Sequence, residues 1–366
     1  MKRRDFIKGA AAAGAASAAA VTAAPAYAQG KRDLKMVTTW PKNFPGLGTA
    51  AERLAQRITD MSDGRLNVKV YAAGELVPPF ESFDAVSGGT ADMYHGAEYY
   101  WQGKSKAFNF FAAVPFGLTA TEQNAWIHHG GGQELWDELA AGFNVKPFMA
   151  ANTGVQMGGW FNKEINSLED VKGLKMQIPV LGGEVLRRLG AAAVSLPGGE
   201  IFPALQSGSI DATEWVGPWN DLAFGFYKIA KFYYYPGFHE PGTTLSSGMN
   251  LEVWNSLSDG DKRVIQTAMA AENSYSLAEF NTRNGDALNT LIEEHGVQLK
   301  KFPDEVMQAI GRVSGEVVKE VGTTGDDITQ RIFESFISFR KDAIAWTKLS
   351  DQAYWNARLL PFEYGN

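Results

Sequence analysis

The stretch LKMVTTWPKNFPGLGTAAERLAQRITDMSDGRLNVKVY, residues 34–71, indicates the architecture of the chain. The short apolar runs Leu34–Thr39 and Leu66–Tyr71 are typical of strands, and the amphipathic stretch Thr49–Ser62 between them is typical of a helix. A strand, a helix and a strand in this order indicate a parallel sheet covered by helices. In such sheets ligands bind beyond the carboxyl ends of the strands, and Trp40 directly follows the first predicted strand.

The length and composition indicate a globular protein of more than one domain. The chain has 366 residues, of which 45% are hydrophobic and 20% are charged, and two lobes are the simplest division of this length. The formal net charge of -7 argues against nucleic acid as a partner, because proteins that bind its phosphate backbone are basic. The absence of cysteine excludes disulfides, thiolate nucleophiles and zinc–thiolate sites.

A weak internal repeat indicates that both lobes have the same design. The two copies share apolar residues, a glycine and an aspartate at equal spacing, namely Phe83, Ala85, Val86, Gly89 and Asp92, then Phe202, Ala204, Leu205, Gly208 and Asp211. Each copy predicts a helix that ends near a glycine and is followed by a short buried strand. Aromatic and polar residues follow both predicted strands, as expected where two lobes face one cleft.

The last third of the chain shows helical periodicity. Amphipathic helices are predicted at Asp261–Phe280, Gly285–His295, Pro303–Val321 and Asp327–Leu349. We therefore expect lobe 1 over residues 29–150, with later segments returning to it, lobe 2 over residues 151–250, and C-terminal helices over residues 251–366 that pack across the lobes. The last helix is long enough to pack within one chain or against a second subunit, so a homodimer stays open.

The N-terminus predicts export. Arg3 and Arg4 begin a motif that is typical of a twin-arginine signal, an Ala-rich stretch follows it, and small residues precede a cleavage point after Ala28. Residues 1–28 are therefore interpreted as a twin-arginine signal peptide. No later segment approaches about 18 consecutive apolar residues, the number that spans a bilayer. We expect the mature protein to be free in the periplasm.

Motifs of catalysis are missing from the sequence. The five histidines are His95, His128, His129, His239 and His295. None of them lies in a recognised partner motif, and the chain has no G-x-S-x-G elbow, no H-E-x-x-H pair and no phosphate-binding P-loop. The residues therefore offer little support for an enzyme.

Five longer segments carry a family resemblance: Gly74–Pro78, Asn152–Phe161, Gly173–Met176, Asp211–Pro218 and Tyr233–Gly237. They resemble the solute-binding proteins of tripartite ATP-independent periplasmic (TRAP) transporters, in particular the branch for 2-oxo acids and other monocarboxylates. The resemblance implies an α/β, two-lobed periplasmic-binding-protein fold, type II-like, with a ligand cleft between the lobes and long C-terminal helices. It also implies capture of a small organic acid and its delivery to membrane permease subunits.

The resemblance further implies a bound metal ion. In relatives the ligand carboxylate shares Na⁺ or Ca²⁺ with a glutamine side chain, a glutamate and the carbonyl of the tryptophan that follows it. The matching positions in this chain are Gln156, Glu214 and Trp215. Oxygen ligands of this kind are what hard cations select.

The predicted ligand contacts include one departure from the family pattern. They are Gln156, Gln177, Asn152, Trp215, Tyr99 and Tyr100, with Trp40 and Trp219 as cleft walls. After Gly173–Met176 the relatives place an arginine that clasps the substrate carboxylate, whereas this chain has Gln177. A neutral amide lacks the charge and the paired donors of a guanidinium group. We therefore expect a larger hydroxy or aromatic acid rather than the smallest 2-oxo acid.

Two functions follow from the sequence. The first is a TRAP solute receptor, which the five segments favour. The alternative is a periplasmic enzyme with a tightly bound cofactor on a similar two-lobed scaffold, which agrees with twin-arginine export because that route carries folded proteins.

Overall fold

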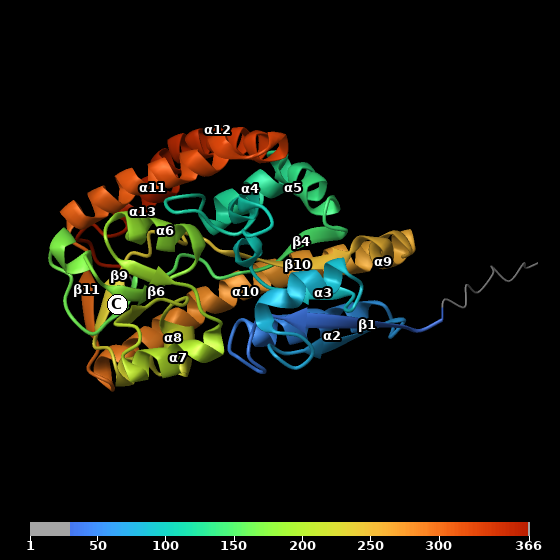
Figure 1. The fold of residues 1–366 in the computed structure, drawn as a ribbon, viewed down its shortest axis with the longest axis horizontal. Coiled ribbons are helices and arrows are strands. Elements are labelled where there is room, and N and C mark those ends of the chain that lie inside the picture. Colours follow the sequence, from blue (N-terminus) through green and yellow to red (C-terminus); the bar gives the residue numbers. More distant parts are fainter. Residues whose placement is uncertain (1–29, 365–366) are drawn as a thin grey trace, which may run out of the picture.

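The computed structural model describes residues 30–364 and shows two sheets flanked by helices (Figure 1). The predicted signal peptide, residues 1–28, lies outside the described residues. We call the first sheet with its helices lobe 1, on the right of Figure 1, and the second lobe 2, on the left. Within residues 30–364, no helix is both long enough and apolar enough to cross a membrane.

The sheet of lobe 1 has the strand order β2-β1-β3-β10-β4. Its strands are β1 (Arg32–Thr38), β2 (Leu66–Tyr71), β3 (Met93–His95), β4 (Val145–Asn152) and β10 (Thr244–Asn250). Strand β1 is parallel to β2 and β3, whereas β10 is antiparallel to β3 and β4. The predicted strand–helix–strand unit is therefore present at the start of the described chain, with parallel strands as expected.

The sheet of lobe 2 has the order β11-β9-β5-β8-β6-β7. Its strands are β5 (Gly159–Phe161), β6 (Lys175–Gln177), β7 (Ala192–Val194), β8 (Ala212–Thr213), β9 (Phe232–Tyr235) and β11 (Gln298–Lys301). Strand β6 is parallel to β7 and β8, and β5 is antiparallel to β8 and β9. Read from the other edge, the order is β7-β6-β8-β5-β9-β11. Its first three strands are parallel to one another and β5 is antiparallel to both of its neighbours, just as β10 is in the order β2-β1-β3-β10-β4 of lobe 1.

Helices connect the strands and extend beyond them. The α-helices are α2 (Gly48–Met61), α3 (Ser82–Ser87), α4 (Ala120–His129), α5 (Gly132–Ala141), α6 (Val180–Arg188), α7 (Gly198–Ser207), α8 (Pro218–Phe224), α9 (Leu251–Asn255), α10 (Asp259–Glu293), α11 (Asp304–Thr324), α12 (Asp327–Leu349) and α13 (Asp351–Ala357). Short 3-10 helices are η1 (Pro79–Glu81), η2 (Glu98–Trp101), η3 (Lys106–Phe111), η4 (Leu168–Val171) and η5 (Phe226–Lys228).

The internal repeat is present in the structure. Helix α3 leads into β3 and helix α7 leads into β8, and each helix ends at a glycine. In both copies the aspartate before the strand accepts a hydrogen bond from the backbone N–H of a lysine on the neighbouring strand. Asp92 Oδ2 accepts from Lys35 N on β1 at 2.7 Å, and Asp211 Oδ2 accepts from Lys175 N on β6 at 3.2 Å. The ends of β3 and β8 therefore hold equivalent places in the two lobes.

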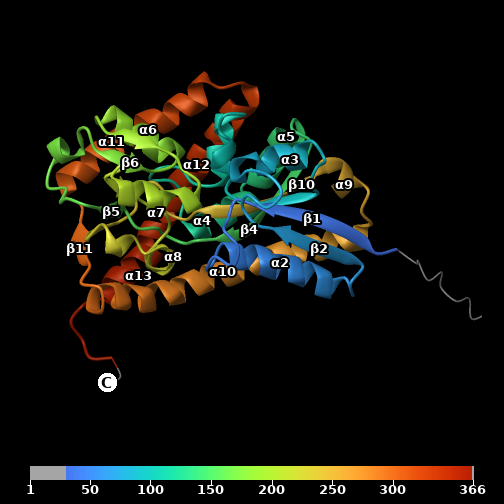
Figure 2. The same ribbon diagram turned by 60° about the horizontal axis from the view of Figure 1, so that its bottom comes forward.

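Three segments and the C-terminal helices join the lobes. Residues 153–158 lead from β4 to β5, residues 236–243 lead from β9 to β10, and α10 runs along both lobes (Figures 1 and 2). Helix α10 contacts lobe 1 through the ion pair of Arg53 with Glu272, at 2.6 Å, and lobe 2 through the rings of Trp219 and Phe280, whose centroids are 5.2 Å apart. The C-terminal helices add a further connection, because Glu320 of α11 pairs with Arg188 of α6 in lobe 2 at 2.7 Å and Ser335 Oγ of α12 accepts from Trp126 Nε1 of α4 in lobe 1 at 3.1 Å.

The C-terminal region differs from the prediction in two ways. The predicted helices at 261–280 and 285–295 are one helix of 35 residues, α10. Gly285 lowers helix propensity by only about 1 kcal/mol, and packing against both lobes compensates for a cost of that size. Strand β11, whose four residues are too short to show a period, pairs with β9 inside the region predicted as helices. Strand β10 is a later segment that pairs in the sheet of lobe 1, and the prediction for lobe 1 included such returning segments without saying which they are.

Two glycines test the packing of this fold. A Cβ at Gly248 in β10 would lie 2.2 Å from the buried Tyr94 ring, whereas Gly285 is exposed on α10 with nothing near its missing side chain. We expect Gly248→Ala to lower the free energy of unfolding by about 1–3 kcal/mol, and Gly285→Ala to raise it by up to about 1 kcal/mol. Thermal melts that showed the two variants shifted alike would contradict this packing.

Candidate functional site

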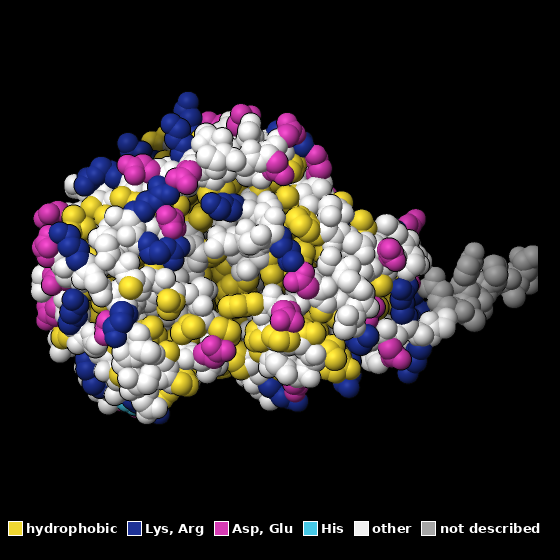
Figure 3. All heavy atoms as spheres, viewed as in Figure 1, with side chains coloured by type: hydrophobic (Ala, Val, Ile, Leu, Met, Phe, Trp, Pro, Cys, Tyr) yellow, Lys and Arg dark blue, Asp and Glu magenta, His cyan; other side chains and the backbone are white. Residues whose placement is uncertain are grey.

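A small cavity lies where the two lobes meet. Its volume is about 10 Å³, and its walls are Trp40, Leu47, Tyr99, Tyr100, Thr153, Gln156, Trp215, Val216, Thr243 and Leu245. This room suits about one water molecule, so a ligand of several heavy atoms requires the lobes to separate or the walls to move. Figure 3 shows hydrophobic side chains gathered along the boundary between the lobes.

Three carboxylates of lobe 2 are buried beside this boundary. Glu214, Asp221 and Glu240 are 2%, 1% and 2% exposed. Among the ion pairs of residues 30–364, none joins these carboxylates to a lysine or arginine. Burial raises the pKa of Asp221 to about 6, burial with the charge of Glu214 raises the pKa of Glu240 to about 7, and burial with the charge of Asp221 raises the pKa of Glu214. Such uncompensated charge favours a bound cation.

Gln156 has an amide oxygen that is free to bind an ion. Its Nε2 donates to Glu240 Oε2 at 2.7 Å and to the hydroxyls of Thr153 and Thr243, both at 3.1 Å. These contacts fix the amide, and its Oε1 is buried with no hydrogen-bond partner among the described residues. Glu240 Oε1 is buried and unpartnered in the same way. Amide and carboxylate oxygens are the ligands that Na⁺ and Ca²⁺ prefer.

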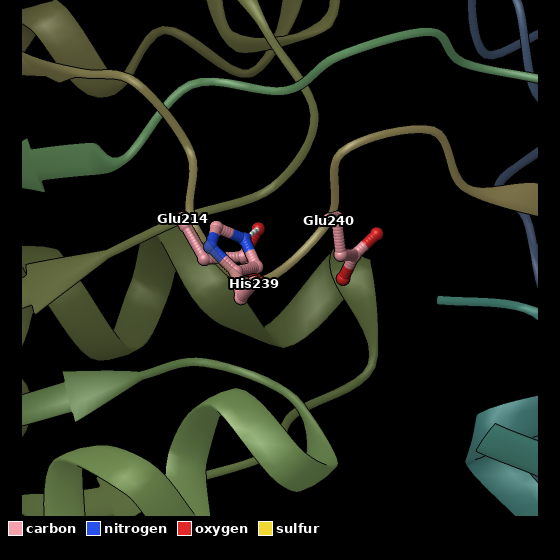
Figure 4. Close-up of side chains that lie close together, drawn as sticks. All are labelled: Glu214, His239 and Glu240. Carbon is pink, nitrogen blue, oxygen red and sulfur yellow. Dashed lines mark hydrogen bonds and ion pairs between the residues drawn. The ribbon is translucent and has the colours of Figure 1, made fainter. Parts of the chain in front are cut away.

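Glu214 follows β8, and the backbone of residues 214–216 is held by the neighbouring strand β6 and by Asp221 of α8. Its N–H donates to the Gln177 carbonyl at 3.2 Å, and the Val216 N–H donates to Asp221 Oδ1 at 3.3 Å. Glu214 Oε2 lies 3.0 Å from Nε2 of His239, and Figure 4 shows these two side chains against each other with Glu240 beside them. One atom from each of these three side chains lies within 4.8 Å of the others.

Aromatic rings from both lobes close the cleft. Trp40 Nε1 donates to His95 Nδ1 at 2.8 Å. His95 can accept this bond because burial lowers its pKa to about 3 and keeps the ring neutral. The Trp40 ring meets Trp215 of lobe 2 nearly at a right angle, with centroids 6.3 Å apart, and lies 6.2 Å from the Tyr100 ring. Trp40 and Trp215 thus form an aromatic contact across the boundary.

The structure brings together most of the predicted site residues. Gln156, Trp215, Tyr99 and Tyr100 line the cavity, and the Tyr99 hydroxyl donates to Glu240 Oε2 at 3.3 Å. Gln177 lies on β6, and its Oε1 accepts from the Thr213 hydroxyl at 2.6 Å. These positions agree with a shared site, although the roles of the residues stay predictions.

Glu214 and Gln177 are not among the cavity walls, and Asn152 and Trp219 make contacts elsewhere. The N–H of Asn152 donates to Ser276 Oγ on α10 at 2.9 Å, and its Oδ1 accepts from Gly154 N at 2.8 Å. Asn152 is therefore part of the connection between the lobes. Trp219, expected as a cleft wall, packs on Phe280 instead. Its position follows from α8, which turns the ring toward α10.

Sequence reasoning missed His239 and Glu240. They follow the recognised segment Tyr233–Gly237 by two and three positions, and an adjacent histidine and glutamate after that segment is the signal that could have found them. No sequence motif around His239 indicated its contact with Glu214. These two residues are 25 positions apart, so only the fold places them together.

Comparisons with known proteins agree with this geometry. Residues 36–324 match the family DctP, described as bacterial extracellular solute-binding protein, family 7. The chain is 44% identical over 322 residues to the monocarboxylate 2-oxoacid-binding periplasmic protein of Nostoc sp., which covers 88% of each chain.

Two solved structures of TRAP solute-binding proteins share the fold. The protein from Bordetella bronchiseptica has a TM-score of 0.88 and 35% identity, covering 90% of this chain and 97% of that one, and is described as a mixed-occupancy dimer with copurified calcium and picolinate. The protein from Pseudoalteromonas atlantica has a TM-score of 0.86 and 41% identity, covering 91% and 100%, and holds sodium and pyruvate.

These similarities decide between the two functions that the sequence left open. They confirm the predicted two-lobed α/β fold and the interpretation as a receptor, because the relatives are solute receptors of transporters and not enzymes. The family match extends over most of the described chain. The chain belongs to the DctP family of bacterial extracellular solute-binding proteins, the solute receptors of TRAP transporters.

Proposed function

We propose that this receptor captures a small organic acid together with Na⁺ or Ca²⁺ in the cleft between its lobes and delivers it to the TRAP membrane subunits. The observation that carries the proposal is the buried pair Glu214 and Glu240, which no lysine or arginine of the described chain neutralises, beside the free amide oxygen of Gln156. A cation supplies the missing positive charge, and the ligand carboxylate adds further oxygen atoms to it.

The residues proposed to hold the cation are Gln156, Glu214 and the carbonyl of Trp215. Glu240 adds negative charge next to them, because its Oε2 accepts from the Gln156 amide. The Nostoc relative is named for monocarboxylate 2-oxo acids, and the two solved relatives hold calcium or sodium with an acid. These relatives support the same class of ligand for this chain.

Gln177 is proposed to select the part of the ligand beyond the carboxylate. The 2.6 Å separation of Thr213 Oγ1 and Gln177 Oε1 is typical of an O–H···O bond. The Thr213 hydroxyl therefore donates to the amide oxygen, and the Gln177 amide nitrogen remains a donor. A hydroxyl, carbonyl or ring nitrogen is the acceptor that fits this donor, so a hydroxy or aromatic acid matches the site and its aromatic walls. The picolinate of the Bordetella relative is an acid of this kind.

The C-terminal segment supports a homodimer. Trp346 and Leu349 at the end of α12 are 69% and 74% exposed, and Tyr354, Trp355, Leu359, Leu360 and Phe362 beyond them are also exposed. Large apolar side chains gathered on one segment mark a contact surface. We propose that a second copy of the chain covers this segment, and the dimer described for the Bordetella relative agrees with this.

The proposed location is the periplasm. The DctP family is extracellular by description, and the N-terminal residues 1–28 carry the features of a twin-arginine signal. Export by that route and cleavage after Ala28 would release the mature receptor on the side of the membrane where the ligand arrives.

Glu214→Gln tests the cation site. The exchange removes one charge and nearly preserves the shape, so we expect Ca²⁺ affinity to fall about tenfold or more and binding of the organic acid to fall with it. Thermal stability of the metal-free protein should barely change. Isothermal calorimetry on metal-stripped protein measures both affinities, with Glu334→Gln on the exposed face of α12 as the control. Ligand affinity that is unchanged by stripping the metal would refute the shared site.

Protonation of Glu240 makes cation binding depend on pH. The pKa of Glu240 is raised to about 7 in the cation-free protein. A proton must therefore leave this carboxyl before its negative charge can attract the cation. Ca²⁺ affinity should therefore increase as the pH rises, by about tenfold between pH 6 and pH 8 for one released proton. This increase should be smaller in Glu240→Gln but still present, because the raised pKa of Glu214 leaves a second carboxyl that must release its proton to the solvent. Calorimetry at both pH values decides the point, and an equal increase in both proteins would show that another group releases the proton.

Gln177→Arg tests ligand choice. A charged contact contributes about 1.5–3 kcal/mol against about 0.5–1.5 kcal/mol for a neutral one, so the variant should bind pyruvate about tenfold more tightly than the native protein. A thermal-shift panel of monocarboxylates, hydroxy acids, aromatic acids and polyols, with Na⁺ and Ca²⁺ supplied in turn, measures the change. The contrary result is a native protein that already binds pyruvate at low micromolar concentration, with no improvement in Gln177→Arg. That result would show that position 177 does not contact the ligand carboxylate.

A further inference from the structure

His239 contacts the proposed cation ligand Glu214 from the outside of the site. It lies between β9 and β10, directly before Glu240, and is 2% exposed. Its Nε2 is 3.0 Å from Glu214 Oε2, as Figure 4 shows. When a cation is bound, Glu214 is ionised and its oxygens only accept, so the imidazole donates through Nε2–H. Among the described residues, this is the side-chain hydrogen bond that Glu214 makes.

We propose that His239 is a positioning residue for the cation: its hydrogen bond holds the Glu214 carboxylate so that an oxygen faces the ion, and the ring itself is not a ligand. This inference rests on the proposed cation site. Carboxylates that bind metals are commonly held by such outer hydrogen bonds, whose loss typically costs 10–100-fold in metal affinity.

The hydrogen bond argues against direct ligation by the ring. In the Nε2–H form, Nε2 has no lone pair for a metal, and the lone pair of Nδ1 points to a different side of the ring. An ion held by Nδ1 would therefore lie away from the Glu214 oxygen that Nε2 contacts. The ion then meets oxygen atoms alone, which selects Na⁺ and Ca²⁺ over zinc and other metals that favour imidazole.

An imidazole suits this place better than a cationic side chain. A neutral N–H donor satisfies one carboxylate lone pair and leaves the negative charge that attracts the cation, whereas a lysine or arginine would neutralise Glu214 and repel the ion. The backbone makes room for the ring, since a Cβ at Gly182 on α6 would lie only 2.9 Å from the His239 Cβ. The Phe238 ring packs at its edge, with centroids 5.3 Å apart. Packing therefore fixes the donor in space.

Two variants separate the N–H donor from the bulk of the ring. His239→Gln keeps an N–H donor near the position of Nε2, and His239→Phe keeps the size of the ring without any donor. Ca²⁺ alone is titrated into metal-stripped protein by calorimetry, with a parallel arm for Zn²⁺. We expect the Phe variant to bind Ca²⁺ 10–100-fold more weakly and the Gln variant to stay within about threefold of the native protein.

Thermal melts without metal show whether each variant is folded, so that affinity and stability are read separately. Ca²⁺ affinity of the Phe variant equal to that of the native protein would overturn the positioning role. A Gln variant as weak as the Phe variant, with Zn²⁺ binding lost in both, would overturn it in favour of direct ligation. Native protein that binds neither Ca²⁺ nor Na⁺ would overturn the proposed cation site itself, and Glu214→Gln would then also have no effect.

Discussion

Negative charge buried between the two lobes is the constraint on which this site depends. Glu214 and Glu240 are out of contact with water, and no lysine or arginine of the described chain pairs with them. A buried charge without compensation costs several kcal/mol. Neutral donors offset part of that cost, namely the amide of Gln156, the hydroxyls of Tyr99 and Thr243, and the imidazole of His239. A cation completes the compensation in our proposal, and this couples ion binding to the capture of an anionic ligand.

The connection between the lobes explains how a nearly closed cavity can receive a ligand. Two short segments, α10 and the C-terminal helices join the lobes, and α10 is fixed to lobe 1 by Arg53 and Glu272 and to lobe 2 by Trp219 and Phe280. Short connecting segments of this kind allow one rigid lobe to rotate against the other. Across the cleft the lobes meet through Trp40 and Trp215, so closure buries the site and removes water from the cation and its ligand.

In our proposal, ligand choice depends on Gln177, a residue that the common fold does not determine. The two solved relatives share the fold of this chain and each holds a metal ion, calcium in one and sodium in the other, yet their acids differ, picolinate in the first and pyruvate in the second. In this chain Thr213 fixes the Gln177 amide so that a neutral donor remains. This donor can form a hydrogen bond with an acceptor on the ligand, while the cation binds the ligand carboxylate. In this proposal the two-lobed fold and the cation select small organic acids, and Gln177 on β6 selects among them.

The sequence alone determined what depends on local pattern: the strand–helix–strand start, the repeat around Asp92 and Asp211, and the segments that resemble the family and name Gln156, Glu214 and Trp215. Tertiary structure decided what depends on distant contacts. The continuity of α10 comes from packing on both lobes, and the return of β10 to lobe 1 comes from strand pairing. Glu240 meets Gln156 across 84 positions, and His239 meets Glu214 across 25. Periodicity reports which face of an element is buried, but only the folded chain determines which distant polar groups share that burial and must therefore satisfy one another.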